Sequence, residues 1–185
     1  GMTHRRVEKD EFYEIVDEFV QAATAKWPNV LIQWEDFTND KAFPLLNRYR
    51  NEVLCFNDDI QGTGAVALAG LLASMRLTGG RLSDQRIVFC GAGSAAVGIA
   101  DMICAGIADE HNLTTEQARR LVWMCDSKGL VTTARDGELE RHKLPYARDE
   151  KPAAELLEII SRVKPTVLIG ASGHAHTFSR DVINT

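Results

Sequence analysis

Two kinds of hydrophobic pattern, one typical of helices and one typical of buried strands, alternate along this chain of 185 residues. In residues 8–26, apolar side chains recur at spacings of three and four between acidic ones, which predicts an amphipathic helix. Farther on, short apolar runs bounded by turn residues predict buried strands, and longer apolar-rich segments predict helices. We expect strands at residues 30–33, 53–56, 86–90, 121–125 and 166–169, and helices at residues 38–46, 64–77, 94–108, 114–119 and 153–163.

The segment 64–77 is the most apolar of the predicted helices. It is rich in Ala and Leu and carries almost no charge, so we expect it to be buried on most sides. Thr78-Gly79-Gly80 should end it, because glycine readily adopts the left-handed conformation found after helices.

Helices that alternate with short apolar strands predict an α/β fold with a doubly wound, Rossmann-like parallel sheet and right-handed crossovers. Few residues follow the last predicted strand, so we expect the sheet to be truncated after the first mononucleotide-binding half. We divide the chain into an N-terminal helix and linker, residues 1–28, and an incomplete α/β domain, residues 29–185.

Acidic residues follow two of the predicted strands. Glu35 and Asp36 come after the first strand, and Asp58 and Asp59 come after the second. Open parallel sheets bind ligands at the carboxyl ends of their strands, and Mg²⁺ and Mn²⁺ prefer several carboxylate oxygens. Taken alone, such pairs more often solvate a loop than bind a metal.

A glycine turn follows the third predicted strand. Gly91 permits a tight bend, Gly93 lets backbone approach a phosphate, and Ala96 allows close packing of helix on strand. Ser94 can cap the following helix and reach a phosphate oxygen, and Ala95 completes the turn. A strand before and a helix after support a dinucleotide site, although a lone turn of this kind is weak support.

The same segments closely resemble the malic enzyme family, which includes malolactic enzymes, and the resemblance covers about residues 28–183. The blocks that carry it are Ile32-Gln33-Trp34-Glu35-Asp36-Phe37, Phe56-Asn57-Asp58-Asp59-Ile60-Gln61-Gly62-Thr63, Gly91-Ala92-Gly93-Ser94-Ala95-Ala96, Asp126-Ser127-Lys128-Gly129-Leu130 and Lys164-Pro165-Thr166-Val167-Leu168-Ile169-Gly170.

This resemblance implies that Mg²⁺ or Mn²⁺ is bound by Glu35, Asp36 and Asp59, and that Asp58 orients a catalytic lysine. It also implies oxidative decarboxylation of malate to pyruvate with NAD or NADP. We expect further cofactor contacts from three residues, namely Thr63, Gly170 and Ser172.

Asp126 is expected to accept hydrogen bonds from the adenosine ribose hydroxyls of the cofactor. It lies farther from the glycine turn than the usual spacing of about 20 residues, and the predicted helix at 114–119 accounts for the extra length. A carboxylate favours NAD, since it would repel the 2′-phosphate of NADP unless cations intervene. Lys128 and Lys143 are the candidate cations, so NADP stays open.

Composition narrows the partners and the compartment. The net charge is −5 and no block of like charges occurs, which argues against nucleic acid as a partner. We expect no membrane span, a cytoplasmic location, and a small malate-like substrate. The four cysteines form no Cys-x-x-Cys pair and are expected to be reduced core thiols. Apolar surface exposed by the missing half-domain should favour a homo-oligomer.

The sequence leaves the activity of the isolated chain open. The family's catalytic tyrosine and lysine and its malate-binding arginine have no matching blocks here, so we expect a truncated form with little activity alone. A malolactic enzyme fragment, which converts malate to lactate, would use the same groups. A non-catalytic nucleotide-binding module or subunit is the alternative from another class.

Overall fold

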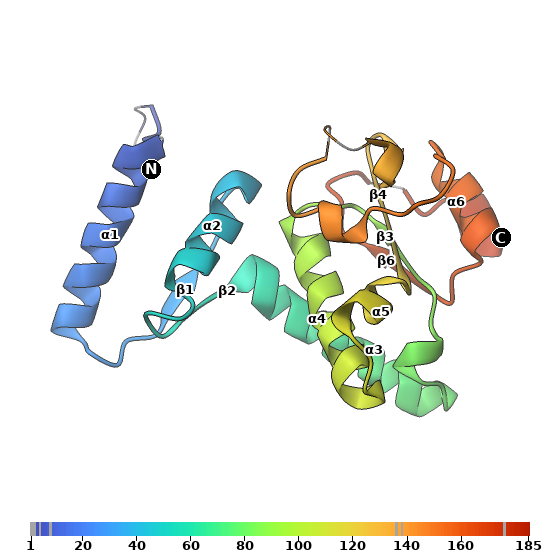
Figure 1. The fold of residues 1–185 in the computed structure, drawn as a ribbon, viewed down its shortest axis with the longest axis horizontal. Helices are drawn as coiled ribbons and strands as arrows, with labels where there is room; N and C mark the ends of the chain where they lie inside the picture. The colour runs from blue at the N-terminus through green and yellow to red at the C-terminus, as the bar shows by residue number, and fades with distance from the viewer. Residues whose placement is uncertain (1–2, 4, 8, 136, 138, 176) are drawn as a thin grey trace.

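The computed structural model describes the whole chain except residues 1, 2, 4, 8, 136, 138 and 176. Its elements form two lobes, a smaller N-terminal one and a larger one that contains the main sheet (Figure 1). The predicted first helix is present as α1 (Lys9–Lys26), and residue 8, where we placed its start, lies outside the described residues.

The N-terminal lobe consists of α1, β1 (Ile32–Trp34), α2 (Asn39–Tyr49) and β2 (Cys55–Asn57). The two strands pair in parallel and form a separate two-stranded sheet. Asp17 of α1 accepts hydrogen bonds from Arg48 and Tyr49 and ties α1 to α2. The lobe has its own apolar core, made of Val16, Val20, Ile32, Trp34, Leu45 and Tyr49.

The larger lobe holds a four-stranded sheet in the order β5-β4-β3-β6. Strand β3 (Ile87–Cys90) is central and pairs in parallel with β4 (Val122–Asp126) and β6 (Val167–Gly170). Short β5 (Gly129–Leu130) adds to β4 in the antiparallel direction. All four residues of β3 are buried, as expected for a strand covered on both faces.

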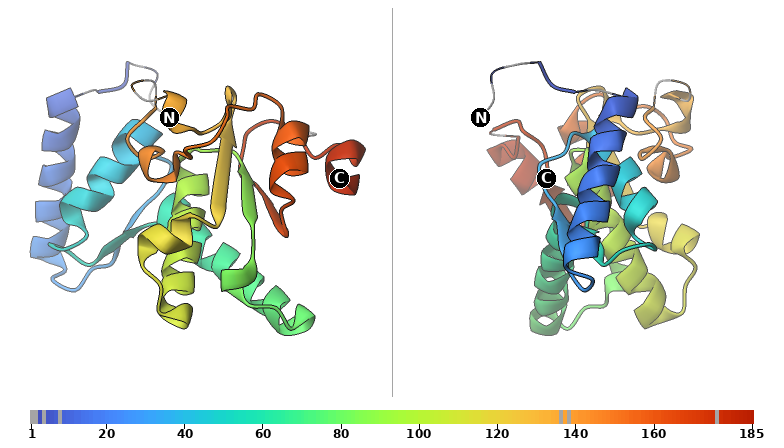
Figure 2. Two further views of the ribbon diagram at one scale, coloured as in Figure 1. Left: turned by 45° about the vertical axis from the view of Figure 1, so that its right-hand side comes forward. Right: turned by 90° about the vertical axis from the view of Figure 1, so that its left-hand side faces the viewer.

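Helices cover both faces of this sheet (Figure 2). On one face, Ile87 and Phe89 pack against α3 (Thr63–Thr78) and α4 (Ser94–His111). On the other face, Val88 packs with Ile159 of α6 (Leu156–Val163). The remaining helices are short: α5 (Thr115–Arg119), α7 (Arg180–Asn184), the 3-10 turns η2 (Leu82–Asp84), η3 (Thr133–Arg135) and η4 (Leu144–Tyr146), and the π-helical turn η1 (Asp58–Gly62).

The prediction of an α/β fold with a Rossmann-like parallel sheet is confirmed. The structure adds that the strands divide between two sheets, and that β5 runs antiparallel to β4. We did not predict β5, because it is only two residues long and carries too little periodicity to register.

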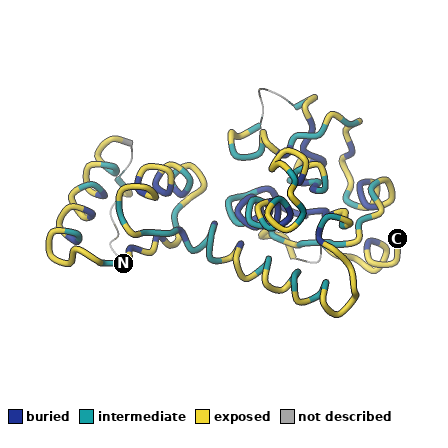
Figure 3. Tube along the Cα trace, turned by 60° about the horizontal axis from the view of Figure 1, so that its bottom comes forward, coloured by how far each residue is buried: buried dark blue, intermediate teal, exposed yellow. Residues whose placement is uncertain are grey.

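The prediction that helix 64–77 is buried on most sides is wrong. Of its residues, Gly64 alone is buried, while Val66 is 75% exposed and Leu77 is 89% exposed. Side chains such as Leu68 and Leu72 pack on α4, but the opposite side of α3 faces solvent (Figure 3). Composition gave the apolar character of this helix correctly, but it cannot give the number of neighbours. The predicted stop is confirmed, since Gly79 ends the helix with φ of 71°.

In the described part of the chain, one helical segment, Asp58–Thr78, is long and apolar enough to cross a membrane by length and composition. A single match of this kind is weak support for a membrane span.

Candidate metal and dinucleotide site

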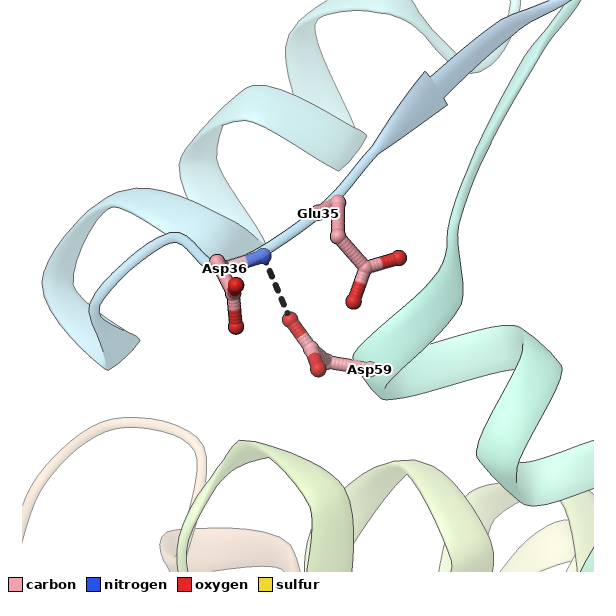
Figure 4. A group of neighbouring side chains, drawn as sticks. All are labelled: Glu35, Asp36 and Asp59. Atoms are coloured by element: carbon pink, nitrogen blue, oxygen red, sulfur yellow. Dashed lines mark hydrogen bonds between the residues drawn. The ribbon is translucent and has the colours of Figure 1, made fainter. Parts of the chain in front are cut away.

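The three predicted metal-binding carboxylates lie together in the structure. Trp34 of β1 pairs with Asn57 of β2, so the residues that follow each strand leave the small sheet at the same edge. Ligand oxygens of Glu35, Asp36 and Asp59 all lie within 4.8 Å of one another, and their side chains point into a common space (Figure 4). The parallel register of two short strands therefore explains their convergence.

The carboxylate cluster fits a hard divalent cation. Around Mg²⁺, oxygen ligands at about 2.0–2.1 Å stand roughly 3 to 4 Å apart, so small side-chain rotations would close the cluster. Glu35 and Asp36 are exposed, and Asp59 is half-buried. The Asp36 amide donates to Asp59 Oδ2 at 3.1 Å, and Gln33 Nε2 donates to Glu35 Oε2 at 2.9 Å. Three acids and open solvent access leave room for further oxygen ligands.

Asp36 has an unusual backbone conformation. Its φ is 58°, in the left-handed region that residues other than glycine adopt rarely, although Asp tolerates it better than most. This turn directs the chain away from β1 directly after Glu35. Local strain of this kind is frequent at ligand sites, and here it places two consecutive carboxylates beside one another.

The π-helical turn η1 carries Asp58 and Asp59. Asn57 is fully buried and caps the turn, since its Oδ1 accepts a hydrogen bond from the Ile60 amide at 2.9 Å. The Asp58 side chain folds back onto Gly62, since a Cβ at Gly62 would lie 3.0 Å from the carboxyl carbon of Asp58, and a side chain there would force this carboxylate to move. Thr63 follows directly and is exposed at the start of α3. Single π-turns are rare and are often found at functional sites.

The turn η1 rests directly on α4, a contact that we did not predict. A Cβ at Gly98 would lie 2.7 Å from the Cα of Ile60, and one at Gly64 would lie 2.9 Å from the carbonyl oxygen of Gly98. Backbone thus packs on backbone between η1, α3 and α4. The small residues at these positions were visible in the sequence, but their partner was not.

The glycine turn joins β3 to α4 as predicted. Gly91 has φ of 122°, and a Cβ there would lie 2.6 Å from the carbonyl carbon of Ala171, so both conformation and space require glycine. Ala96 is fully buried. Gly170 ends β6, and the Ser172 amide lies within 3.1 Å of the same hypothetical Cβ. The predicted residues of the turn and those after β6 are therefore neighbours.

The predicted cap of α4 needs correction. Gly93 occupies the N-cap position, and Ser94 is the first helical residue, so the Ser94 hydroxyl does not cap the helix. Instead, Asn39 of α2 accepts a hydrogen bond from the Ser94 amide at 3.1 Å. Ala95 follows in the first turn and is half-buried. Sequence reasoning missed Asn39 because it lies 55 residues from its partner.

Asp126, at the end of β4, is held by two cations. Arg135 Nη2 donates to its Oδ2 at 2.9 Å, and Lys143 Nζ lies 3.2 Å from the same oxygen. The Lys128 amide donates to Oδ1 at 2.9 Å. Burial alone would raise the pKa of Asp126, but these hydrogen bonds and the Arg135 charge outweigh it and lower the pKa to about 2. Lys143 was one of the two predicted cations, whereas Arg135 was missed.

A Rossmann-like sheet with its glycine turn, next to a second small sheet with a carboxylate cluster, defines a dinucleotide-binding α/β protein. Comparison with known proteins narrows this class. A family profile described as malic enzyme, NAD binding domain, matches residues 60–185, and one described as malic enzyme, N-terminal domain, matches residues 1–50. The chain belongs to the malic enzyme family.

Individual relatives agree with the profiles. The chain is 48% identical over 185 residues to an NADP-dependent malic enzyme of Dictyostelium discoideum, covering 99% of this chain and 34% of that protein. It is 46% identical over 191 residues to an NAD-dependent malic enzyme of Cronobacter sakazakii, with the same coverage. The crystal structure of Entamoeba histolytica malic enzyme matches with a TM-score of 0.68 and 26% identity, covering 86% of this chain and 32% of that one.

The chain spans about a third of the length of these relatives. Its two profile matches fall on the two lobes, and residues 51–59, which include Asp58 and Asp59, lie between them. Within the carboxylate cluster, Glu35 and Asp36 belong to the first matched region, and Asp59 directly precedes the second.

Proposed function

We propose that this chain supplies the divalent-metal and dinucleotide-binding part of a malic enzyme that oxidises and decarboxylates malate to pyruvate. The observation that carries the proposal is the convergence of Glu35, Asp36 and Asp59 beside the lobe with the glycine turn. Membership of the malic enzyme family supports both the cofactor class and the substrate.

Each group has a distinct part in this proposal. The carboxylates of Glu35, Asp36 and Asp59 hold the metal, and Mg²⁺ or Mn²⁺ bound there supplies Lewis acid chemistry to an oxygen-chelating substrate. Asp58 lies against Gly62 and is proposed to orient the catalytic lysine of the malic enzyme reaction.

The cofactor's phosphates and nicotinamide meet other residues. Gly91, Gly93 and the amides of Ala95 and Ala96 in the first turn of α4 receive the pyrophosphate, with the Ser94 hydroxyl beside them, while the Ser94 amide donates to Asn39. Gly170 and Ser172 line the nicotinamide side, next to Gly91. Thr63 is the remaining proposed cofactor contact.

The contacts around Asp126, at the proposed adenosine ribose end of the site, support NADP binding more strongly than the sequence did. Asp126 would repel a 2′-phosphate if it stood alone, but Arg135 and Lys143 both pair with it and offset its charge, and Lys143 is shared with Glu140. A phosphate can compete for the same two cations, since guanidinium and ammonium groups bind phosphate as readily as carboxylate. We therefore propose that the site accepts NADP as well as NAD.

The isolated chain should bind without rapid turnover. The tyrosine and lysine that serve as acid and base in the family have no matching blocks in these 185 residues, and a missing positioned base typically lowers the rate about 10²- to 10⁴-fold. Metal-dependent cofactor binding distinguishes this proposal from a nucleotide-binding module unrelated to malate, which would bind cofactor equally well without metal or malate.

Calorimetric titration with NAD and NADP, each with and without Mn²⁺ and malate, tests the proposal. We expect Mn²⁺ binding that Asp59→Asn weakens by tenfold or more, because Asn keeps the acceptor for the Asp36 amide but loses the charge. Asp109→Asn, at an exposed acid near the end of α4, is the matched control. Equal Mn²⁺ affinity in both variants would overturn the metal assignment.

We further propose that two copies of this chain associate through α3 and β6. Strand β6 forms an edge of the described sheet, and its Val-Leu-Ile-Gly run has neither charge nor Pro to discourage pairing with another strand. Helix α3 packs on the same core cluster as Val167 and Ile169 of β6, and its opposite side exposes the apolar side chains of Val66 and Leu77. Sedimentation should show an association that Val66→Glu weakens, whereas a monomer at all concentrations would refute it.

A further inference from the structure

The side chain of His142 contacts the glycine turn between β3 and α4, where we propose that the cofactor pyrophosphate binds. Its Nε2 lies 3.2 Å from the carbonyl oxygen of Ala92, inside the glycine turn, and 3.4 Å from Glu140 Oε2, so both of its neighbours are acceptors. Its ring stacks on Phe43 of α2, with centroids 5.4 Å apart and planes 15° from parallel. The side chain is 12% exposed. One histidine therefore contacts the turn of the larger lobe and a helix of the smaller lobe.

The contact with Ala92 has a direct consequence for phosphate binding. A carbonyl oxygen only accepts, so the Nε2 of His142 carries the proton and donates it. The carbonyl of Ala92 and the amide of Gly93 belong to one planar peptide unit and point in opposite directions. By holding the carbonyl, His142 fixes the direction of the Gly93 N–H, which belongs to the turn that receives pyrophosphate.

The next residue connects His142 to the ribose end of the site. Lys143 Nζ lies 3.2 Å from Asp126 and 3.0 Å from Glu140. Consecutive Cα atoms are about 3.8 Å apart, so a shift of the His142 backbone would carry the backbone of Lys143 with it. The segment 140–143 thus links the pyrophosphate turn to the cation that would meet a 2′-phosphate.

The surroundings leave His142 without a substitute. His142 and Phe43 lie in the wall of a cavity of about 840 Å³ between α2 and α4, together with Val97 and Pro145. Removing the imidazole would enlarge an existing space. Among the described residues, no other side chain donates a hydrogen bond to the carbonyl of Ala92.

We propose that His142 is a positioning residue for the cofactor, which orients the pyrophosphate-binding turn and sets the placement of Lys143 toward a 2′-phosphate. This inference rests on the proposed function for its cofactor. Its effect on the turn and on segment 140–143 exists in the free protein as well.

Three variants of the full chain test it: His142→Ala, His142→Gln and, as control, His111→Ala at the far end of α4. Titration with NAD and NADP should show about tenfold weaker NAD binding for His142→Ala, the effect of one lost hydrogen bond. The loss for NADP should be larger, because Lys143 is displaced too. Mn²⁺ binding should stay unchanged. His142→Gln should recover most NAD affinity, since its amide can donate to Ala92.

Hydrogen exchange in the free variants provides a readout that needs no cofactor. His142→Ala should speed exchange at residues 91–95 and 140–146, and His111→Ala should not. Unchanged exchange there would overturn the positioning role, as would equal losses for NAD and NADP or a glutamine variant no better than alanine. Faster exchange in a protein whose wild type binds neither cofactor would refute the proposed function but retain the role of His142 in ordering the turn.

Discussion

Substituting Gly98 by Ala tests the backbone contact that sets η1 on α4. The new Cβ would lie 2.7 Å from the Cα of Ile60 and closer still to the carbonyl oxygen of Ile60, whereas ordinary contact begins at 3.4 Å, so the two elements must separate by more than about 0.7 Å. Overpacking of this kind costs about 3 kcal/mol at its upper range, and rigid backbone neighbours place it there. The helix gains about 1 kcal/mol from Ala over Gly, which leaves a net loss of about 2 kcal/mol.

Gly70→Ala is the matched control, because a Cβ at Gly70 of α3 has no atom within 4 Å. This change should stabilise the protein by about 0.5–1 kcal/mol. A protein of this size changes its melting temperature by about 2–4 °C per kcal/mol, so Gly98→Ala should melt about 4–8 °C below wild type and Gly70→Ala slightly above it. Thermal unfolding followed by circular dichroism measures both. Equal midpoints for the two variants would show that the contact at Ile60 is not as close as described.

Three further predictions concern the site and the thiols. Asp126 has a pKa lowered to about 2, so its ion pairs stabilise the fold fully above pH 4, and this stabilisation is lost as the pH falls through 2. The difference in urea unfolding midpoint between wild type and Asp126→Asn should therefore narrow from pH 5 to pH 3. Asp36→Ala should unfold with about 1 kcal/mol less free energy than Asp36→Gly, because φ of 58° strains a residue with a Cβ; identical urea curves would contradict this. Burial raises the pKa of Cys104 to about 11 and that of Cys125 to about 12. A disulfide reagent at pH 8 should therefore modify the half-buried Cys55 first, and Cys55→Ser should remove the fast phase of thiol modification.

Local sequence patterns were enough to predict the parallel sheet and its glycine turn. The glycine turn follows β3 and precedes α4 directly in the sequence. Because these elements are contiguous, local sequence patterns are enough to predict how they connect. The grouping of Glu35, Asp36 and Asp59 could be expected because each follows a strand, and parallel neighbouring strands end at the same edge.

Other features depended on partners far away in the sequence. The exposure of α3 could not be read from its composition, since an apolar helix looks the same with one neighbour or three. Arg135 follows Asp126 by nine residues, but only the fold of the intervening β5 and η3 turns it back onto the carboxylate. Asn39 meets Ser94 only after the two lobes have come together.

The two halves of the proposed site are joined through backbone. Asp59 stands on η1, which packs without intervening side chains on α4 at Gly98, and α4 begins at the cofactor turn. Asn39 and the stacked pair of Phe43 and His142 add contacts between the lobes. Under the proposed function, a metal that closes the carboxylates would restrain η1 and hence α4. Binding of metal and of cofactor should then be coupled, and thermodynamic reciprocity requires each to change the affinity of the other by the same factor.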